Sequence, residues 1–235
     1  RKPVAEPGKE STTPLSGLLS VLAAVAGIIL LSVFLSYFYR AQRAGGARES
    51  YQAGNELVKE GRYPEAIERY RNALSISHTS EHRLALALAL VEAGRLNEAQ
   101  VYLRELLKVD PGSGPANLGL ARVAAGQGDL QEAVTYFHRG IYGSWSANAP
   151  ENRFQARVEL VEVLGRSGQK TQAQAELLSL VAEMPADPVV RKRAGHLLLE
   201  FGLYRESAGV FRDVLQQEKR DAEAYAGLGE AELAR

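Results

Sequence analysis

The sequence predicts an all-α protein in which one N-terminal transmembrane helix is followed by a solenoid of about five helical repeats and the start of a sixth. Two observations lead to this fold. No residue from Ser11 to Tyr39 carries a charge. After that stretch, a pattern of glycine, small and bulky residues recurs at intervals of 33 to 40 residues. One such unit cannot bury its apolar face alone, so the units must stack on one another.

The composition excludes several functions. The 28 basic residues balance the 28 acidic ones, so the chain has no overall positive field to attract nucleic acid. Cysteine is absent, which excludes disulfides, thiol catalysis, zinc-thiolate sites and covalent haem attachment. Because 46% of the 235 residues are hydrophobic, the chain can build a sizeable core. We therefore expect a folded protein with no nucleic-acid partner.

The N-terminal segment is interpreted as a membrane anchor. We assign residues 1–13 to a polar tail, 14–39 to a transmembrane helix and 40–47 to a linker. The apolar run can cross about 30 Å of hydrocarbon as a helix. It ends with an aromatic cluster followed by Arg40, which is typical of a membrane interface. A signal peptide would have a shorter apolar region and a small-residue cleavage site. We therefore expect residues 14–39 to contact the lipid bilayer.

Small residues gather on one face of this helix, namely Ser16, Ser20, Ala23, Ala24 and Gly27. Such a face permits close approach of a second helix inside a membrane. We therefore predict that it contacts a partner helix. The alternative is that these residues reflect the ordinary composition of membrane helices.

The repeat is defined by three positions. Glycine occupies the first, at Gly61, Gly94, Gly128, Gly168 and Gly202. The second, five residues later, is small: Ala66, Ala99, Ala133, Ala173 and Ser207. The third, four residues further on, is bulky: Tyr70, Leu103, Phe137, Leu177 and Phe211. Successive glycines are separated by 33, 34, 40 and 34 residues.

This pattern resembles the tetratricopeptide repeat (TPR), a helix-turn-helix unit of about 34 residues. The resemblance covers the chain from Arg48 to its end. It divides residues 48–235 into units at 48–80, 81–113, 114–150, 151–187, 188–221 and, in part, 222–235. It implies that the glycine lies at the turn between an inner and an outer helix. The small residue would lie where those helices touch, and the bulky one would fill the space against the next unit.

Some positions depart from the family pattern. At His78, Lys170 and Ser207 we expect looser packing. The step of 40 residues reflects an insertion at residues 143–150, which contains the single tryptophan, Trp145. In one interpretation Trp145 fills the gap between the third and fourth repeats. In the other it is an exposed aromatic contact for a partner.

The sequence contains no recognisable catalytic constellation. It has no HExxH, GxxxxGK[ST] or GxSxG motif. His78 and His82 are four residues apart, but no carboxylate is placed to complete a metal site with them. We therefore expect no enzyme activity, metal, cofactor or small-molecule substrate.

The resemblance implies a binding groove on the concave side of the solenoid, lined by the inner helices. Two positions in each repeat would point into it: Tyr51, Asn55, Leu84, Leu88, Leu118, Arg122, Val158, Glu162, Lys192 and His196. The first three repeats would offer a mainly apolar floor, and the next two a mixed charged surface. Exposed apolar surface usually marks a protein-binding site. In the alternative, the three leucines simply pack within their repeats.

Some members of the family hold a peptide carboxylate with a clamp of lysine, asparagine and arginine from successive repeats. Asn55 matches one clamp position, but Ala85, Pro115 and Gly119 occupy others. The clamp is absent from this sequence. We therefore do not expect a chaperone C-terminal tail as the ligand.

Together these features indicate a single-pass membrane scaffold or assembly subunit that binds another protein of a membrane complex. One alternative is the anchoring or regulatory part of a larger enzyme or redox complex, whose catalytic part lies beyond Arg235 or on another chain. Another is a quality-control or chaperone adaptor. Arginine outnumbers lysine, and alanine, glycine and leucine are abundant, which suggests a GC-rich bacterial genome. We therefore expect the membrane to be a bacterial inner membrane. Basic residues are balanced on the two sides of the span. We place the repeats on the extracytoplasmic side, with a cytoplasmic array as the alternative.

Overall fold

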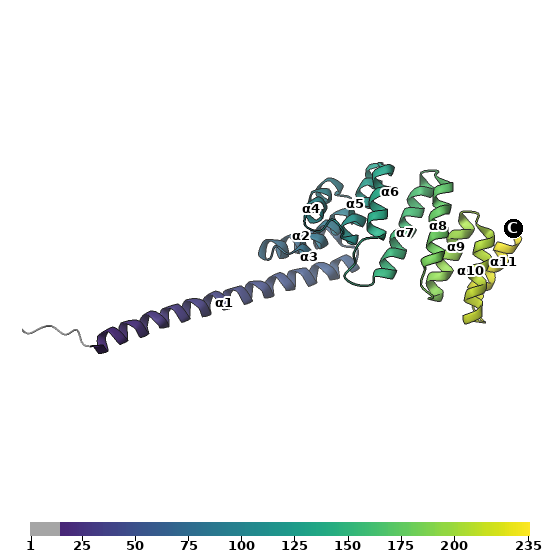
Figure 1. The fold of residues 1–235 in the computed structure, drawn as a ribbon. Coiled ribbons are helices and arrows are strands. Elements are labelled where there is room, and N and C mark those ends of the chain that lie inside the picture. The colour runs from purple at the N-terminus through teal and green to yellow at the C-terminus, as the bar shows by residue number, and fades with distance from the viewer. Residues whose placement is uncertain (1–14) are drawn as a thin grey trace, which may run out of the picture.

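The computed structural model describes the backbone of residues 15–235 and the side chains of residues 19–38 and 45–235. The regular elements of this part of the chain are α-helices stacked into a solenoid (Figure 1), which confirms the predicted fold class. The helices are α1 (Leu15–Lys59), α2 (Tyr63–Ile76), α3 (Ser80–Glu92), α4 (Leu96–Val109), α5 (Gly114–Gln127), α6 (Leu130–Ile141), α7 (Ala149–Arg166), α8 (Lys170–Glu183), α9 (Pro188–Glu200), α10 (Tyr204–Gln217) and α11 (Ala222–Leu233).

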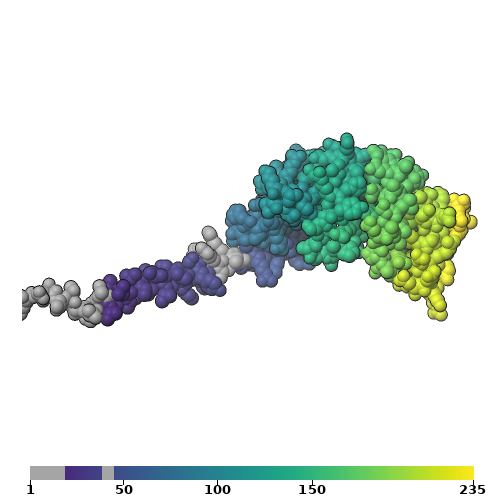
Figure 2. All heavy atoms as spheres, viewed as in Figure 1, coloured from purple at the N-terminus to yellow at the C-terminus, as the bar shows by residue number. Residues whose placement is uncertain are grey.

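Helix α1 joins the apolar segment to the first repeat without interruption. It is 45 residues long, and residues 40–47, for which we expected a linker, are helical. Its apolar part, Leu19–Phe38, has a mean hydropathy of 2.6 and is long enough to cross a membrane, as an anchor or a signal sequence would. This part projects from the solenoid as a rod (Figures 1 and 2). The expected polar tail, residues 1–13, lies outside the described residues.

A glycine in the left-handed region terminates the inner helix of each complete pair. The φ angles are 72° at Gly61 and Gly94, 82° at Gly128, 74° at Gly168 and 78° at Gly202. A residue with a Cβ atom is strained in this conformation, whereas glycine is not. The turn position predicted for these glycines is therefore confirmed, and the conformation explains why they recur.

The small residues of the pattern lie where the two helices of a pair touch. All five, from Ala66 to Ser207, are 0% exposed. We expected looser packing at Ser207. Instead, its Oγ donates a hydrogen bond to the carbonyl oxygen of Gly195 at 2.8 Å, from α10 to α9. The buried hydroxyl is thereby satisfied, so serine replaces alanine without leaving an unpaired polar group.

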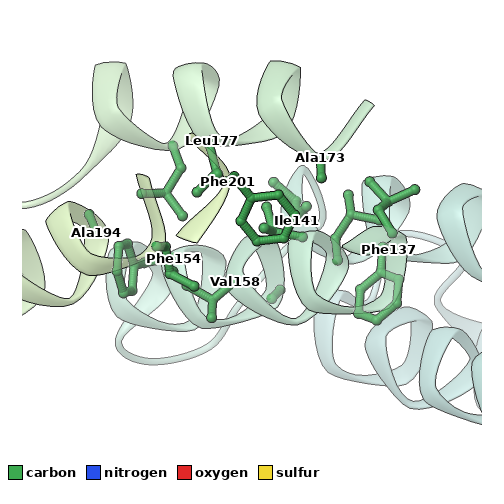
Figure 3. Packing of buried hydrophobic residues seen from close by; sticks show 14 of the residues in the cluster. Phe137, Ile141, Phe154, Val158, Ala173, Leu177, Ala194 and Phe201 are labelled. Atoms are coloured by element: carbon green, nitrogen blue, oxygen red, sulfur yellow. The ribbon is translucent and has the colours of Figure 1, made fainter. Parts of the chain in front are cut away.

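The bulky residues of the pattern form the core between repeats. Figure 3 shows Phe137 of α6, Phe154 and Val158 of α7, Leu177 of α8 and Phe201, which caps α9, in one cluster. Phe137 and Leu177 are 1% and 0% exposed. Because these bulky side chains belong to clusters that span neighbouring repeats, the repeats stabilise one another in series.

The insertion folds back onto the third repeat. The N–H of Gly114 donates to the carbonyl oxygen of Ser144 at 2.9 Å, and the N–H of Ser144 donates to that of Gly112 at 2.8 Å. The indole Nε1 of Trp145 donates to the carbonyl oxygen of Gly140 at 3.0 Å. The half-buried ring of Trp145 also lies against Gly114, where a Cβ atom would approach it to 2.5 Å. Trp145 therefore has a packing role, and these contacts are with the third repeat.

Candidate protein-binding groove

The inner helices of the first three repeats line an open surface cavity of about 580 Å³. Five of the residues expected on the concave face line it: Tyr51 and Asn55 of α1, Leu84 and Leu88 of α3, and Arg122 of α5. We call this cavity the groove. The structure therefore brings together five of the ten residues expected on this surface.

One wall of the groove is aromatic and held by hydrogen bonding. The hydroxyl of Tyr70 donates to Oδ1 of Asn55 at 2.7 Å. The Tyr70 ring fits because Gly54 has no Cβ atom, which would come within 2.6 Å of it. The Tyr51 ring lies 5.7 Å from that of Tyr70 and 5.0 Å from that of His82. Burial raises the pKa of Tyr70 to about 12, so this hydroxyl remains a donor at neutral pH.

The apolar floor is smaller than expected. Leu84 and Leu88 are half-buried and line the groove, so they are available to a ligand. Leu118 is not, because it is 7% exposed and belongs to the core. Helix α6 packs closely over it at Gly140, where a Cβ atom would lie 3.2 Å from the Leu118 nitrogen. Val158 is 0% exposed and belongs to the same core cluster. The placement of these two side chains on the concave surface is wrong.

Arg122 is an ion-paired residue at the end of the groove. Its Nε and one terminal nitrogen donate to the two carboxylate oxygens of Glu159 at 2.8 Å each. Its other terminal nitrogen lies 3.4 Å from Glu92. Burial opposes the charge of the guanidinium, but the hydrogen bonds to Glu159 outweigh it and raise the pKa of Arg122. The cation is therefore neutralised within the protein.

The remaining expected residues lie outside the groove. Glu162 lines a separate cavity of about 450 Å³, which Arg122 also reaches. Lys192 pairs with Asp221 and Glu223 at 2.8 Å each, and these hydrogen bonds raise its pKa. His196 Nε2 lies 3.2 Å from Glu223. Lys192 and His196 of α9 thus connect the fifth repeat to α11.

The sequence reasoning missed three polar residues of the groove. Tyr63 of α2 and the carboxylates of Glu81 and Glu92 line it. The helical spacing could have predicted the two acids, because they lie on the same face of the helix as Leu84 and Leu88. The spacing of 3, 4 and 4 residues from Glu81 to Glu92 places all four on one face of α3.

The small-residue face of the membrane segment lies on the exposed surface of α1. Residues 19–38 are exposed throughout, and nothing lies within 4 Å of a Cβ built on Gly27. Ala23 and Ala24 belong to this exposed stretch, as does Ser20. The Ser16 side chain lies outside the described residues. Contact of this face with a partner helix stays a prediction.

His78 of the histidine pair is exposed. His82 is buried, and its Nδ1 lies 2.9 Å from the carbonyl oxygen of Ser77. Among the described residues, no group of three histidine or acidic side chains could hold a metal ion.

Comparisons with known proteins support the repeat assignment. Residues 90–142 and 192–235 each match a family model described as tetratricopeptide repeat. The TPR repeat-containing thioredoxin TTL4 of Arabidopsis thaliana is 32% identical over 94 residues. That match spans 40% of this chain and 14% of the relative.

Three solved structures share the fold. A thermophilic TPR protein of Thermus thermophilus is 19% identical with a TM-score of 0.53, covering 80% of this chain and 99% of that one. PilF of Pseudomonas aeruginosa is 17% identical with a TM-score of 0.56, covering 82% and 90%. PilW, described as a type IV pilus biogenesis factor, is 17% identical with a TM-score of 0.53, covering 80% and 90%. Residues 90–142 and 192–235 therefore carry tetratricopeptide repeats, a repeat that commonly mediates protein–protein interaction or assembly. The solenoid shares its fold with the three TPR-type structures.

Proposed function

We propose that the protein is a membrane-anchored scaffold or assembly subunit whose groove binds another protein of a membrane complex. The observation that carries this proposal is the continuity of α1. The same helix contains the apolar segment and two residues of the groove wall, Tyr51 and Asn55. No flexible segment separates the two within α1, so the helix that enters the membrane also positions the binding surface.

This continuity sets the distance between groove and bilayer. Tyr51 follows Phe38, the last residue of the apolar segment, by 13 positions. At a rise of 1.5 Å per residue, the groove wall begins about 20 Å along the helix from the membrane boundary. A partner segment just outside the bilayer is within reach at that height. We therefore favour a membrane protein as the partner over a freely diffusing one.

The structural neighbours are consistent with an assembly role. PilW is described as a pilus biogenesis factor, and PilF shares the same fold. At 17% identity this likeness concerns the fold, so the partner of this chain is proposed from its own groove. We place the chain in a bacterial inner membrane with the repeats on the extracytoplasmic side. Protease treatment of intact spheroplasts tests that side, because an extracytoplasmic array is cleaved and a cytoplasmic one is protected.

Site-specific photo-crosslinking in native membranes tests the binding function. A photoreactive phenylalanine replaces Leu88 in the groove, and the matched control replaces Val101 of α4, which is 58% exposed. We expect one defined protein adduct from position 88 and none from position 101, with mass spectrometry identifying the adduct as a membrane protein. Absence of an adduct at position 88, or the same adducts at both positions, would contradict the proposal.

A further inference from the structure

We infer that the groove selects a basic amphipathic segment of its partner. This segment carries a pair of apolar side chains with one cationic side chain on each side of the pair. This inference rests on the proposed function and specifies the chemistry of the partner.

The charge of Arg122 is already neutralised by carboxylates of the protein. Both oxygens of Glu159 bind its guanidinium, and Glu92 contacts the remaining nitrogen. One cation thus lies between two carboxylates, which leaves this cluster with a net negative charge. Glu92, with its side chain 43% exposed, is the member with a single long contact of 3.4 Å. An incoming cation can therefore bind Glu92, whereas an incoming anion meets like charge.

The wider surface around the groove carries more carboxylates than guanidinium groups. Glu81 lines the groove and makes no ion pair within the described part of the chain. Asp110 lines an adjoining cavity of about 690 Å³ that shares Tyr51, Glu81 and Leu84 with the groove. Arg48 and His82 line a third adjoining cavity, and Nδ1 of His82 lies 2.9 Å from the carbonyl oxygen of Ser77. Four carboxylates, counting Glu159, therefore face two guanidinium groups, and the potential favours a basic ligand.

The acidic and apolar residues of the groove follow a regular order along α3. Glu81, Leu84, Leu88 and Glu92 follow one another on a single helical stripe, with the acids at its ends and the leucines between them. The two acids lie eleven positions apart, a distance of about 16 Å along the axis. A helix carrying two lysines eleven positions apart, with two leucines between them on the same face, matches this stripe. The tyrosine rings of the groove wall offer further attraction for a cation.

Binding of two designed helical peptides to the full chain tests this inference. Both carry the leucine pair, and they differ in having lysines or glutamates at the two flanking positions. The chain is reconstituted in nanodiscs of neutral phosphatidylcholine, and fluorescence anisotropy is compared with that of empty nanodiscs. We expect the lysine peptide to bind about tenfold more tightly than the glutamate peptide.

Three variants connect that preference to the two acids. Replacing both, as Glu81→Gln with Glu92→Gln, should weaken lysine-peptide binding on the order of fivefold, as loss of two partly exposed ion pairs implies. Reversing both, as Glu81→Lys with Glu92→Lys, should make the glutamate peptide the tighter ligand. The control Glu200→Gln removes an exposed carboxylate at the end of α9 and should change nothing. Thermal unfolding of each variant checks that the repeats remain folded.

The outcomes separate this inference from the proposed function. The inference would be overturned if the unmodified chain bound the two peptides equally or bound the glutamate peptide more tightly. It would also be overturned if the preference for the lysine peptide remained in both the double glutamine variant and the double lysine variant. If crosslinking at position 88 still captures a defined membrane protein, the scaffold function stands while the basic ligand is rejected. If no adduct forms there either, both are rejected.

Discussion

The guanidinium of Arg122 donates two hydrogen bonds of 2.8 Å to the carboxylate of Glu159, 37 positions later in the chain. This pair joins α5 to α7, and therefore the third repeat to the fourth, at the joint that the insertion lengthens. The two side chains are 29% and 19% exposed, so much of the pair is withdrawn from water. A bidentate ion pair that is partly shielded from water fixes the relative geometry of the two helices and also contributes energy. Arg122 is thus a residue of the joint.

Reversing the charge of Arg122 should destabilise the fold. Arg122→Glu places a carboxylate against Glu159 and Glu92, and we expect the free energy of unfolding to fall by about 2 kcal/mol. Urea unfolding of the full chain in detergent, followed by helical circular dichroism, measures this. The control Arg104→Glu changes an exposed arginine of α4 that makes no ion pair among the described residues.

The exchanged pair, Arg122→Glu with Glu159→Arg, should recover part of that loss because it restores opposite charges across the joint. If Arg122→Glu unfolds like the unmodified chain, the pair does not stabilise the joint.

A bulky side chain at the helix–helix contact of a repeat should also lower stability. Ala99 is 0% exposed between α3 and α4, and Ala99→Phe overpacks that contact at a cost of about 1–3 kcal/mol. Ala175→Phe introduces the same side chain at an exposed position of α8 and serves as the control. Thermal unfolding should show a lower midpoint for the first variant alone. An unchanged midpoint for Ala99→Phe would mean that the register of the repeat is misassigned.

Local backbone and packing requirements made the repeat predictable from sequence. Gly128 adopts φ 82°, a conformation that excludes most residues, so glycine marks the turn wherever it recurs. Ala133 is fully buried because two helix backbones approach each other there. Both requirements act over a few residues and restrict which residue types can occupy these positions. The glycine and alanine positions therefore gave the correct register before any tertiary contact was known.

The groove was less predictable because it depends on how neighbouring helices rotate against each other. A fixed offset from the turn glycine put Val158 on the surface, but this residue is buried and the next one, Glu159, reaches Arg122 instead. Leu118 is likewise covered by α6, whose close approach is permitted by Gly140. Residue type alone did not distinguish a leucine of the floor, such as Leu84, from one of the core. That difference arises from inter-repeat packing.

Trp145 and Gly114 should show energetic coupling. The indole ring occupies the space that a Cβ atom on Gly114 would need, with a closest approach of 2.5 Å. We expect Gly114→Ala to displace the ring and Trp145→Ala to cost about 2 kcal/mol, because the half-buried ring and its hydrogen bond to Gly140 are lost. In the double variant the new methyl group has room, so the combined loss should be about 1 kcal/mol smaller than the sum. Additive losses in a double-mutant cycle would contradict this contact.

The stability of the first repeat should fall at alkaline pH because the Tyr70 hydroxyl ionises. Burial raises its pKa to about 12, above the ordinary value near 10, so the folded chain keeps a proton that the unfolded chain releases. Its contribution to stability is therefore fully present below pH 10 and is lost as pH rises from about 10 to about 12. Urea unfolding across this range should show a smaller alkaline loss for Tyr70→Phe, which lacks the phenol. Equal slopes for the two chains would exclude Tyr70 as the group responsible.

Gly27 tests whether α1 also recognises a partner inside the membrane. A Cβ atom at this position meets nothing within 4 Å in the described chain, so Gly27→Leu cannot disturb the fold by a clash there. If the small-residue face packs against a second helix, the leucine separates the two and recovery of the crosslinked partner should fall several-fold. Ala26→Leu adds similar bulk about 100° further round the helix and should leave recovery unchanged. Both variants should remain in the membrane fraction after a carbonate wash, because neither reduces the hydrophobicity of the segment. Full recovery of the partner with Gly27→Leu would show that the groove acts without a helix contact at this position.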